Sequence, residues 1–154
     1  MSTIHFEFVT QDRVVYKGDA SMVLVPGADG VIGVLPKHAP LMAVVNPGEV
    51  LVRKEGEADQ FFVTGGGFVE VRPDKVILLA RSGESSAEID VVRAEAAKRR
   101  AEEFLASPEH ARDPEVRVAM EAALRRSAAR LQIAHRRHGG RTPGRRGVDF
   151  TPSE

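Results

Sequence analysis

The chain has 154 residues, of which 42% are hydrophobic and 29% charged, an ordinary balance for a globular protein. It contains no cysteine, which excludes disulfides and cysteine-ligated metal sites. Its formal net charge is zero, so charge gives no reason to expect nucleic acid as a partner. We find neither the pattern of a secretory signal at the start nor an apolar run of about 20 residues, the length of a membrane helix.

Charge and composition change together along the chain. Residues 1–86 hold eight Lys and Arg against eleven Asp and Glu, whereas residues 87–154 hold fourteen against eleven. In the second part Ala, Arg, Glu and Lys replace strand-forming residues. These changes predict a β-domain at 1–86 and a helical part at 87–138, followed by a Gly-, Pro- and Arg-rich tail at 139–154 that we expect to be disordered.

Residues 1–81 have the pattern of short strands separated by turns. From residue 4 to residue 9, isoleucine and phenylalanine alternate with more polar positions, as in a half-buried strand. Further apolar runs, each with Gly or Pro near one end, lie at 22–25, 50–52, 61–63, 68–71 and 76–80. This spacing predicts a sandwich or barrel. The glycines of 64–67 lack the lysine of a phosphate loop and precede a strand, so we predict a turn there.

The stretch from Gly30 to Leu41 combines apolar residues with two glycines and two prolines. Glycine allows backbone angles that other residues avoid, and proline fixes φ and removes a backbone donor. The spacing therefore predicts a rigid loop rather than a helix or a central strand. Its only residue that titrates near neutral pH, His38, has no nucleophile beside it, and we interpret the stretch as a contact surface.

Two helices are predicted after the β-domain. Ser85–Glu88 has the pattern of a capping box, which predicts the start of a first helix that ends near Ser107. Asp113 is the expected N-cap of a second helix, with Pro114 in its first turn. The short connection predicts an antiparallel hairpin. Because its apolar face is rich in alanine and shallow, we expect it to pack on the β-domain or on another chain.

Arg126 and Arg130 lie one turn apart in the second helix, and neither has an acidic residue three or four positions away. Like charges at this spacing are unfavourable by roughly a few tenths of a kcal/mol. A nucleotide phosphate or the carboxylates of another subunit would explain the pair, and two solvated arginines are the simpler alternative.

No pattern of catalytic or metal-ligating residues is found. The five histidines include no pair with the spacing of metal ligands, and no Ser-His-Asp arrangement with a nucleophile-elbow motif occurs. We therefore predict neither a catalytic residue nor a metal site, and we expect the arginines after residue 135 to form a solvated tail.

Several motifs follow one another in a fixed order along about residues 3–137. They are Pro26-Gly27, Gly30, Gly33-Val34-Leu35-Pro36, His38-Ala39-Pro40-Leu41, Pro47-Gly48, Gly66-Gly67-Phe68-Val69-Glu70-Val71 and Ile89-Asp90-Val91-Val92-Arg93-Ala94. In sequence and spacing this set resembles the epsilon subunits of F-type ATP synthases.

The resemblance implies an α+β fold, in which an N-terminal ten-stranded β-sandwich is followed by a C-terminal antiparallel two-helix hairpin. It implies a non-catalytic rotor subunit of the central stalk that binds the gamma subunit, sits on the c-subunit ring and helps couple proton translocation to ATP synthesis. Asp29, Gly30 and Val31 correspond to the family's c-ring contact, and His38 is a further candidate for it. The complex alone would hold the chain at the cytoplasmic face of the bacterial inner membrane.

The resemblance also implies a regulatory arm. In the family the helices lie folded on the sandwich or extend along gamma, where they inhibit ATP hydrolysis through basic residues that face the beta subunit. Some bacterial members bind ATP in the folded form. The corresponding positions here are Glu84, Ile89, Asp90, Arg93, Ala94, Arg126 and Arg130. No cofactor is required on this interpretation, and ATP is a candidate regulatory ligand.

Two other functions stay open from the sequence. One is a stand-alone nucleotide sensor, whose arm closes on ATP while the sandwich supports it. The other is a small enzyme that uses His38. Substitution of His38 would distinguish this enzyme from a stalk subunit, because the enzyme would lose activity while the stalk subunit would still assemble.

Overall fold

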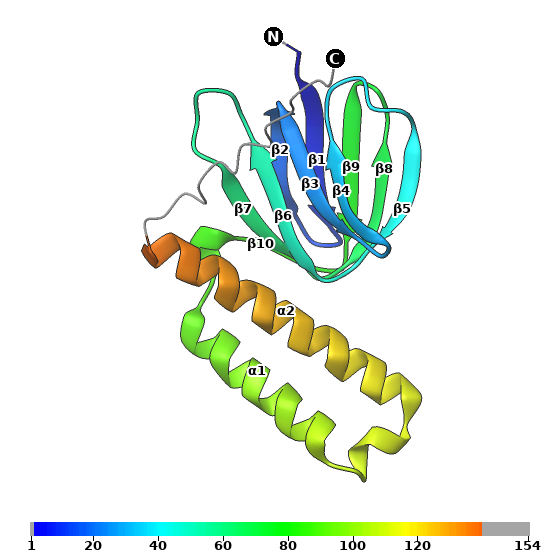
Figure 1. The fold of residues 1–154 in the computed structure, drawn as a ribbon, viewed down its shortest axis with the longest axis vertical. Helices are drawn as coiled ribbons and strands as arrows, with labels where there is room; N and C mark the ends of the chain where they lie inside the picture. The colour runs from blue at the N-terminus through cyan, green and yellow to red at the C-terminus, as the bar shows by residue number, and fades with distance from the viewer. Residues whose placement is uncertain (1, 140–154) are drawn as a thin grey trace, which may run out of the picture.

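The structure is a computed structural model, and it describes residues 2–139. Ten strands are followed by two long helices (Figure 1), which confirms the fold class that the resemblance implied. The strands are β1 (Ile4–Thr10), β2 (Val14–Ala20), β3 (Met22–Gly27), β4 (Gly30–Val34), β5 (Leu41–Val45), β6 (Gly48–Arg53), β7 (Gln60–Thr64), β8 (Gly67–Val71), β9 (Lys75–Ala80) and β10 (Gly83–Ser85). The helices are η1 (Ser86–Glu88), α1 (Val91–Ala106), η2 (His110–Arg112) and α2 (Pro114–Gly139).

Strand β3 joins the two sheets of the sandwich. Its first half pairs with β6, which continues to β7 and β10, and its last residue, Gly27, lies opposite Val45 of β5. From β5 the second sheet continues through β8, β9 and β1 to β2. The pairs are antiparallel except for β1 with β9. The core between the sheets is built largely from valine and phenylalanine, including Phe6 and Phe8, which are fully buried.

Residues 30–41 do not form one loop, contrary to the prediction. Gly30–Val34 form β4, and β5 begins at Leu41, so only 35–40 are irregular. Both prolines lie outside the strands, and among the described residues β4 pairs only with β3, so it is an edge strand that accommodates a glycine. Only the first of the two glycines, Gly30, needs the left-handed region, with φ of 133°.

The glycines of 64–67 form a turn between β7 and β8, as predicted. Gly66 has φ of 89°, which favours glycine. A Cβ atom on Gly65 would lie 2.1 Å from the Ser82 hydroxyl, and one on Gly67 would lie 2.0 Å from the Leu79 carbonyl oxygen. The glycines therefore allow close packing of the turn on the end of β9.

Helix α1 begins later than predicted. Glu88 accepts a hydrogen bond from the Ser85 N–H at 2.7 Å, but this capping box heads only the single 3₁₀ turn η1. The chain is then extended at Ile89, which is 5% exposed, and Asp90 caps α1 by accepting from the Arg93 N–H at 3.1 Å. Burial of Ile89 under α2 thus interrupts what the sequence predicted as one helix.

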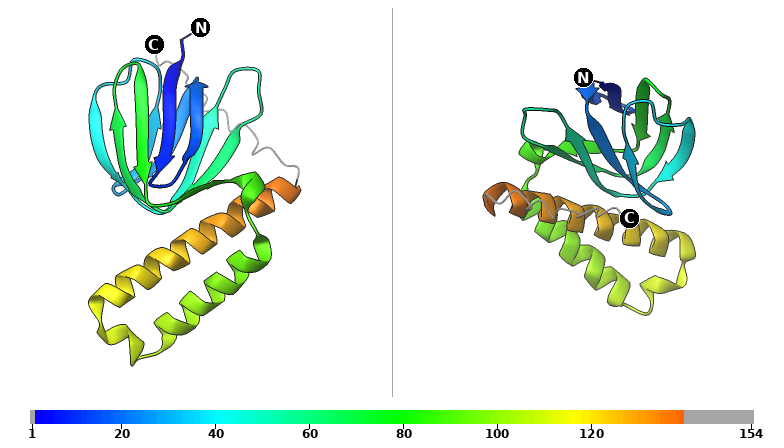
Figure 2. Two further views of the ribbon diagram at one scale, coloured as in Figure 1. Left: turned by 180° about the vertical axis from the view of Figure 1, so that it is seen from behind. Right: turned by 45° about the horizontal axis from the view of Figure 1, so that its top comes forward.

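The two helices form the predicted antiparallel hairpin (Figure 2). Asp113 caps α2 through the Glu115 N–H at 3.0 Å, and α1 ends at Ala106, close to the predicted position. The C-terminal half of α2 packs on the outer side of β7 through a small cluster. Its buried members are Val63, Ile89, Ile133 and Ala134. The tail prediction from residue 140 onward lies outside the described residues.

Candidate functional site

A pocket of about 190 Å³ lies where the segment between the two domains meets the hairpin. Its lining is mostly charged and comes from β10, η1, the start of α1 and α2. The lining residues are Glu84, Glu88, Asp90, Arg93, Ala94 and Arg130. The structure therefore brings together five of the seven positions that the resemblance predicted for ATP, and it adds Glu88.

Two of the predicted residues form an ion pair across the pocket. Arg130 of α2 donates to the Glu84 carboxylate of β10, and both side chains are largely buried. Asp90 is occupied as the N-cap of α1. Ala94 is 2% exposed, and its small side chain allows α1 to lie close to α2. In this arrangement the predicted binding residues hold the hairpin on the sandwich.

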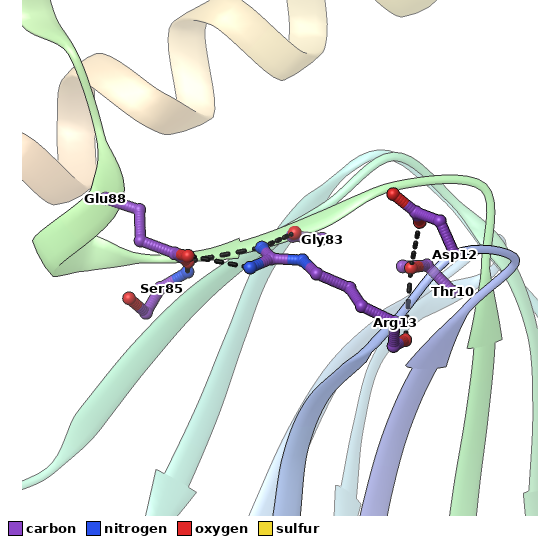
Figure 3. Close-up of polar contacts among 6 residues, drawn as sticks. All are labelled: Thr10, Asp12, Arg13, Gly83, Ser85 and Glu88. Carbon is purple, nitrogen blue, oxygen red and sulfur yellow. Dashed lines mark hydrogen bonds and ion pairs between the residues drawn. The ribbon is translucent and has the colours of Figure 1, made fainter.

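Glu88 is compensated from outside the pocket. The Arg13 guanidinium lies 2.7 Å from one carboxylate oxygen and 3.2 Å from the other, and the Ser85 N–H also donates to the carboxylate (Figure 3). The hydrogen bonds from Arg13, and next that from Ser85, hold the pKa of Glu88 at about 2, well below its usual range. Sequence reasoning used Glu88 only as part of a capping box and did not include Arg13.

The remaining two predicted residues do not line the pocket. Ile89 belongs to the apolar cluster under α2. Arg126 is half-buried and is not paired with any carboxylate of the described residues 2–139. Burial lowers the pKa of Arg126, and the nearby charges of Arg130 and Arg81 lower it further. Arg126 is thus a partly desolvated cation near two others, a setting that favours an anion.

The residues predicted to contact the c-ring lie at two ends of β4. Asp29, Gly30 and Val31 form the exposed turn between β3 and β4, and Val31 is 73% exposed. His38 follows the other end of β4, where its Nδ1 donates to the Ala39 carbonyl oxygen at 2.6 Å. Five residues of strand separate the two groups by about 13 Å at ~3.3 Å per residue. A surface that touched both would have to follow the free edge of β4.

The two sheets differ on their outer faces. Figure 2 (left) faces the sheet of β5, β8, β9, β1 and β2, and no helix covers it. Register places Val44 opposite Phe68, and Leu79 lies opposite both Phe68 and Val9, which in turn faces Val14. This apolar row consists of Val44, Phe68, Leu79, Val9 and Val14. All but Val9 are 51–60% exposed.

Sequence reasoning did not identify the apolar row, although a signal was present. Strands 41–45, 67–71 and 75–80 carry apolar residues on both faces, a pattern typical of strands that are covered on both sides. We interpreted their periodicity only as evidence for a core. The described residues include no group of three or more His, Asp or Glu side chains that could hold a metal ion.

Fold and site together define a two-domain protein with a β-sandwich and a helical arm. The model of the ATP synthase delta/epsilon chain beta-sandwich domain matches residues 3–86, and that of the delta/epsilon chain long alpha-helix domain matches residues 87–135. The chain belongs to the ATP synthase delta/epsilon family.

Named relatives are ATP synthase epsilon chains. That of Moorella thermoacetica is 44% identical over 135 residues, which cover 87% of this chain and 98% of the relative. That of Alkalilimnicola ehrlichii is 38% identical and covers 88% and 95% of the two chains. In fold, the chain is similar to one in the Euglena gracilis mitochondrial ATP synthase, with a TM-score of 0.71, 24% identity, and coverage of 84% of this chain and 79% of that one.

Neither helix of the described part, residues 2–139, is both long and apolar enough to cross a membrane. An association of this part with a membrane through a helical span is therefore not supported.

Proposed function

We propose that the chain is a non-catalytic rotor subunit in the central stalk of an F-type ATP synthase, where it helps couple proton translocation to ATP synthesis. The observation that carries this proposal is the uncovered apolar row, taken with family membership. On the other sheet, α2 covers the outward-facing Val63 of β7 with Ile133 and Ala134. The apolar row has the same character without a cover from this chain, and exposed apolar patches of this kind mark protein interfaces.

The gamma subunit is the partner that we propose for the apolar row. A Glu at Phe68 or Leu79 would leave a charge in a dry interface, so we expect either variant to lose most of its gamma binding. Co-purification with the gamma subunit measures this. Val92 of α1 is 76% exposed and lies outside the row, so Val92→Glu is the matched control and should retain binding. Undiminished binding by both row variants would refute the proposed contact.

We further propose that the turn at Asp29–Val31 contacts the c-ring, and that the hairpin, when it leaves the sandwich, reaches the beta subunit and inhibits ATP hydrolysis. The turn is exposed, and the hairpin is attached through only a small apolar cluster and one ion pair. Since the chain has no cysteine, a single Cys at Val31 can be cross-linked selectively. Cross-linking to subunit c in the assembled complex supports the contact, and its absence contradicts it.

Arg126 favours a second role, in which ATP binds as a regulatory ligand. At about 190 Å³ the pocket is below the range of roughly 300–1,000 Å³ that is usual for ligand sites. Bound phosphates would therefore have to displace Glu84 from Arg130 and reach Arg126. The stand-alone sensor makes the same prediction about ATP but none about gamma.

Titration of the full chain with MgATP, followed by amide NMR signals, tests this second role. We expect saturable shifts near Asp90, Arg93 and Arg130, and their loss in Arg126→Ala. Arg125 is its exposed neighbour, so Arg125→Ala should bind as the parent does. If millimolar MgATP causes no saturable shift in the parent chain, ATP is not a ligand.

A further inference from the structure

The segment Gly83–Glu88 is tied to the sandwich by a side chain from the opposite end of the domain sequence. Arg13 donates to the Glu88 carboxylate at 2.7 and 3.2 Å, and to the Gly83 carbonyl oxygen at 2.6 Å (Figure 3). Glu88 accepts from the Ser85 N–H as well. We call this group, Arg13 with Gly83, Ser85 and Glu88, the Arg13 clasp.

The Arg13 end of the clasp is itself held in place. The Thr10 N–H donates to the Arg13 carbonyl oxygen at 2.9 Å, and the Thr10 hydroxyl donates to the Asp12 carboxylate at 2.7 Å. These bonds close the turn between β1 and β2, and Thr10 is 7% exposed. Arg13 therefore extends from a fixed point on the sandwich, and a two-toothed pairing of guanidinium with carboxylate fixes orientation as well as distance.

The hairpin is attached to the sandwich by different residues. Its contacts are the apolar cluster, to which α2 contributes Ile133 and Ala134, and the ion pair of Glu84 with Arg130. No bond of the Arg13 clasp involves a residue of α1 or α2. Separation of the hairpin would break the cluster and the ion pair but would leave every bond of the clasp intact.

We propose that the Arg13 clasp keeps residues 83–88 on the sandwich when the hairpin separates from it, so that Ile89 and Asp90 form the hinge. These two residues are extended, with ψ of 121° and 106°, and they lie between the end of η1 and the start of α1. Asp90 moves with α1 as its N-cap. Arg13 is then a positioning residue that acts through Glu88, whatever partner the free arm binds.

Amide hydrogen exchange on the full chain tests the proposal in a background where the hairpin is undocked. Ile133→Asp places a charge in the apolar cluster, where Ile133 is 1% exposed, and should release the hairpin. We expect residues 83–88 to exchange as in the parent chain in this background. Adding Arg13→Ala should then speed their exchange by about two- to fivefold, the size expected for a partly exposed ion pair.

Arg53→Ala is the matched control, because Arg53 makes a similar two-toothed pair with Asp59 at 2.9 and 2.7 Å on the same sandwich. It should leave the exchange of 83–88 unchanged. If Ile133→Asp impairs folding, Ala134→Glu disrupts the same cluster. The proposal is overturned if undocking alone frees residues 83–88, or if Arg13→Ala has no larger effect than Arg53→Ala. Neither result bears on gamma or ATP binding.

Discussion

The outer faces of the two sheets have similar sequences and different environments. On the sheet of β6, β7 and β10, α2 covers the outward apolar residue Val63. On the other sheet, the apolar row that includes Phe68 and Leu79 has no cover within the described chain. The comparison shows that apolar residues on both faces of a strand predict a cover, but not whether the same chain supplies it.

The covered face also shows how weakly the arm is held. The core between the sheets contains many fully buried residues, whereas four buried residues form the cluster under α2. Because elements with few buried contacts open at the lowest free energies, we expect the hairpin to separate long before the sandwich unfolds.

The largest expected effect concerns the core that both sheets share. Phe8 is fully exposed to neither face and contacts the rings of Phe6 and Phe62 at centroid distances of 6.4 and 6.2 Å. We expect Phe8→Ala to lower the free energy of unfolding by about 3–5 kcal/mol, as measured by urea denaturation. Phe68→Ala, on the uncovered face, should change it by only about 0.5 kcal/mol in the isolated chain. Equal losses would contradict the view that the apolar row is free.

Removing part of the cover should have the next largest effect. We expect Ile133→Ala to lower the stability of hairpin docking by about 2 kcal/mol, near the low end for buried Ile→Ala, because the separated hairpin no longer shares the penalty with the sandwich. Amides of α2 should then exchange faster, while those of β1 and β9 stay as slow as before. Val118→Ala, at an exposed site on the same helix, is the control. Parallel acceleration in both domains would show that they unfold as one unit.

The N-cap of α1 gives a smaller effect. Asp90→Ala removes the bond to the Arg93 N–H and should lower helix stability by about 1 kcal/mol, seen as a loss of helical circular dichroism on heating. Asp90→Asn keeps a capping oxygen and should restore most of this. A loss of helix in Asp90→Asn as large as in Asp90→Ala would mean that charge, and not capping, is the role of Asp90.

Acid should weaken the segment between the domains slightly. The pKa of Glu88 is lowered to about 2, so its contribution to stability is complete above its usual value of 4.5 and is lost as the pH falls through about 2. Because Glu88 and Arg13 are 44% and 42% exposed, solvent screening limits the effect to about 0.5 kcal/mol.

Comparison of the parent chain with Glu88→Gln isolates this contribution, since Glu7 and Asp59 also have lowered pKa values. The stability difference between the two chains should be present at pH 6 and should vanish toward pH 2. A difference that is the same at both pH values would mean that the Glu88 charge does not stabilise the folded chain.

The predictions from sequence were accurate where the signal was local. Alternation identified β1, and Asp113 with Pro114 marked the start of α2, because pleating and capping involve neighbouring residues. The loop prediction for 30–41 was wrong at Gly30–Val34, since whether a glycine-containing strand is tolerated depends on its place at a sheet edge. The capping box was real but headed only η1.

The sequence by itself determined the class of fold, the order of its elements and, through ordered motifs, the family. Only the tertiary structure decided which apolar faces are covered, that Arg126 lies outside the pocket, and that Arg13 meets Glu88 across 75 positions of sequence. The reason is physical: periodicity, capping and turn chemistry act between near neighbours, whereas burial and ion pairing across a sandwich depend on which distant segments the folded core brings together.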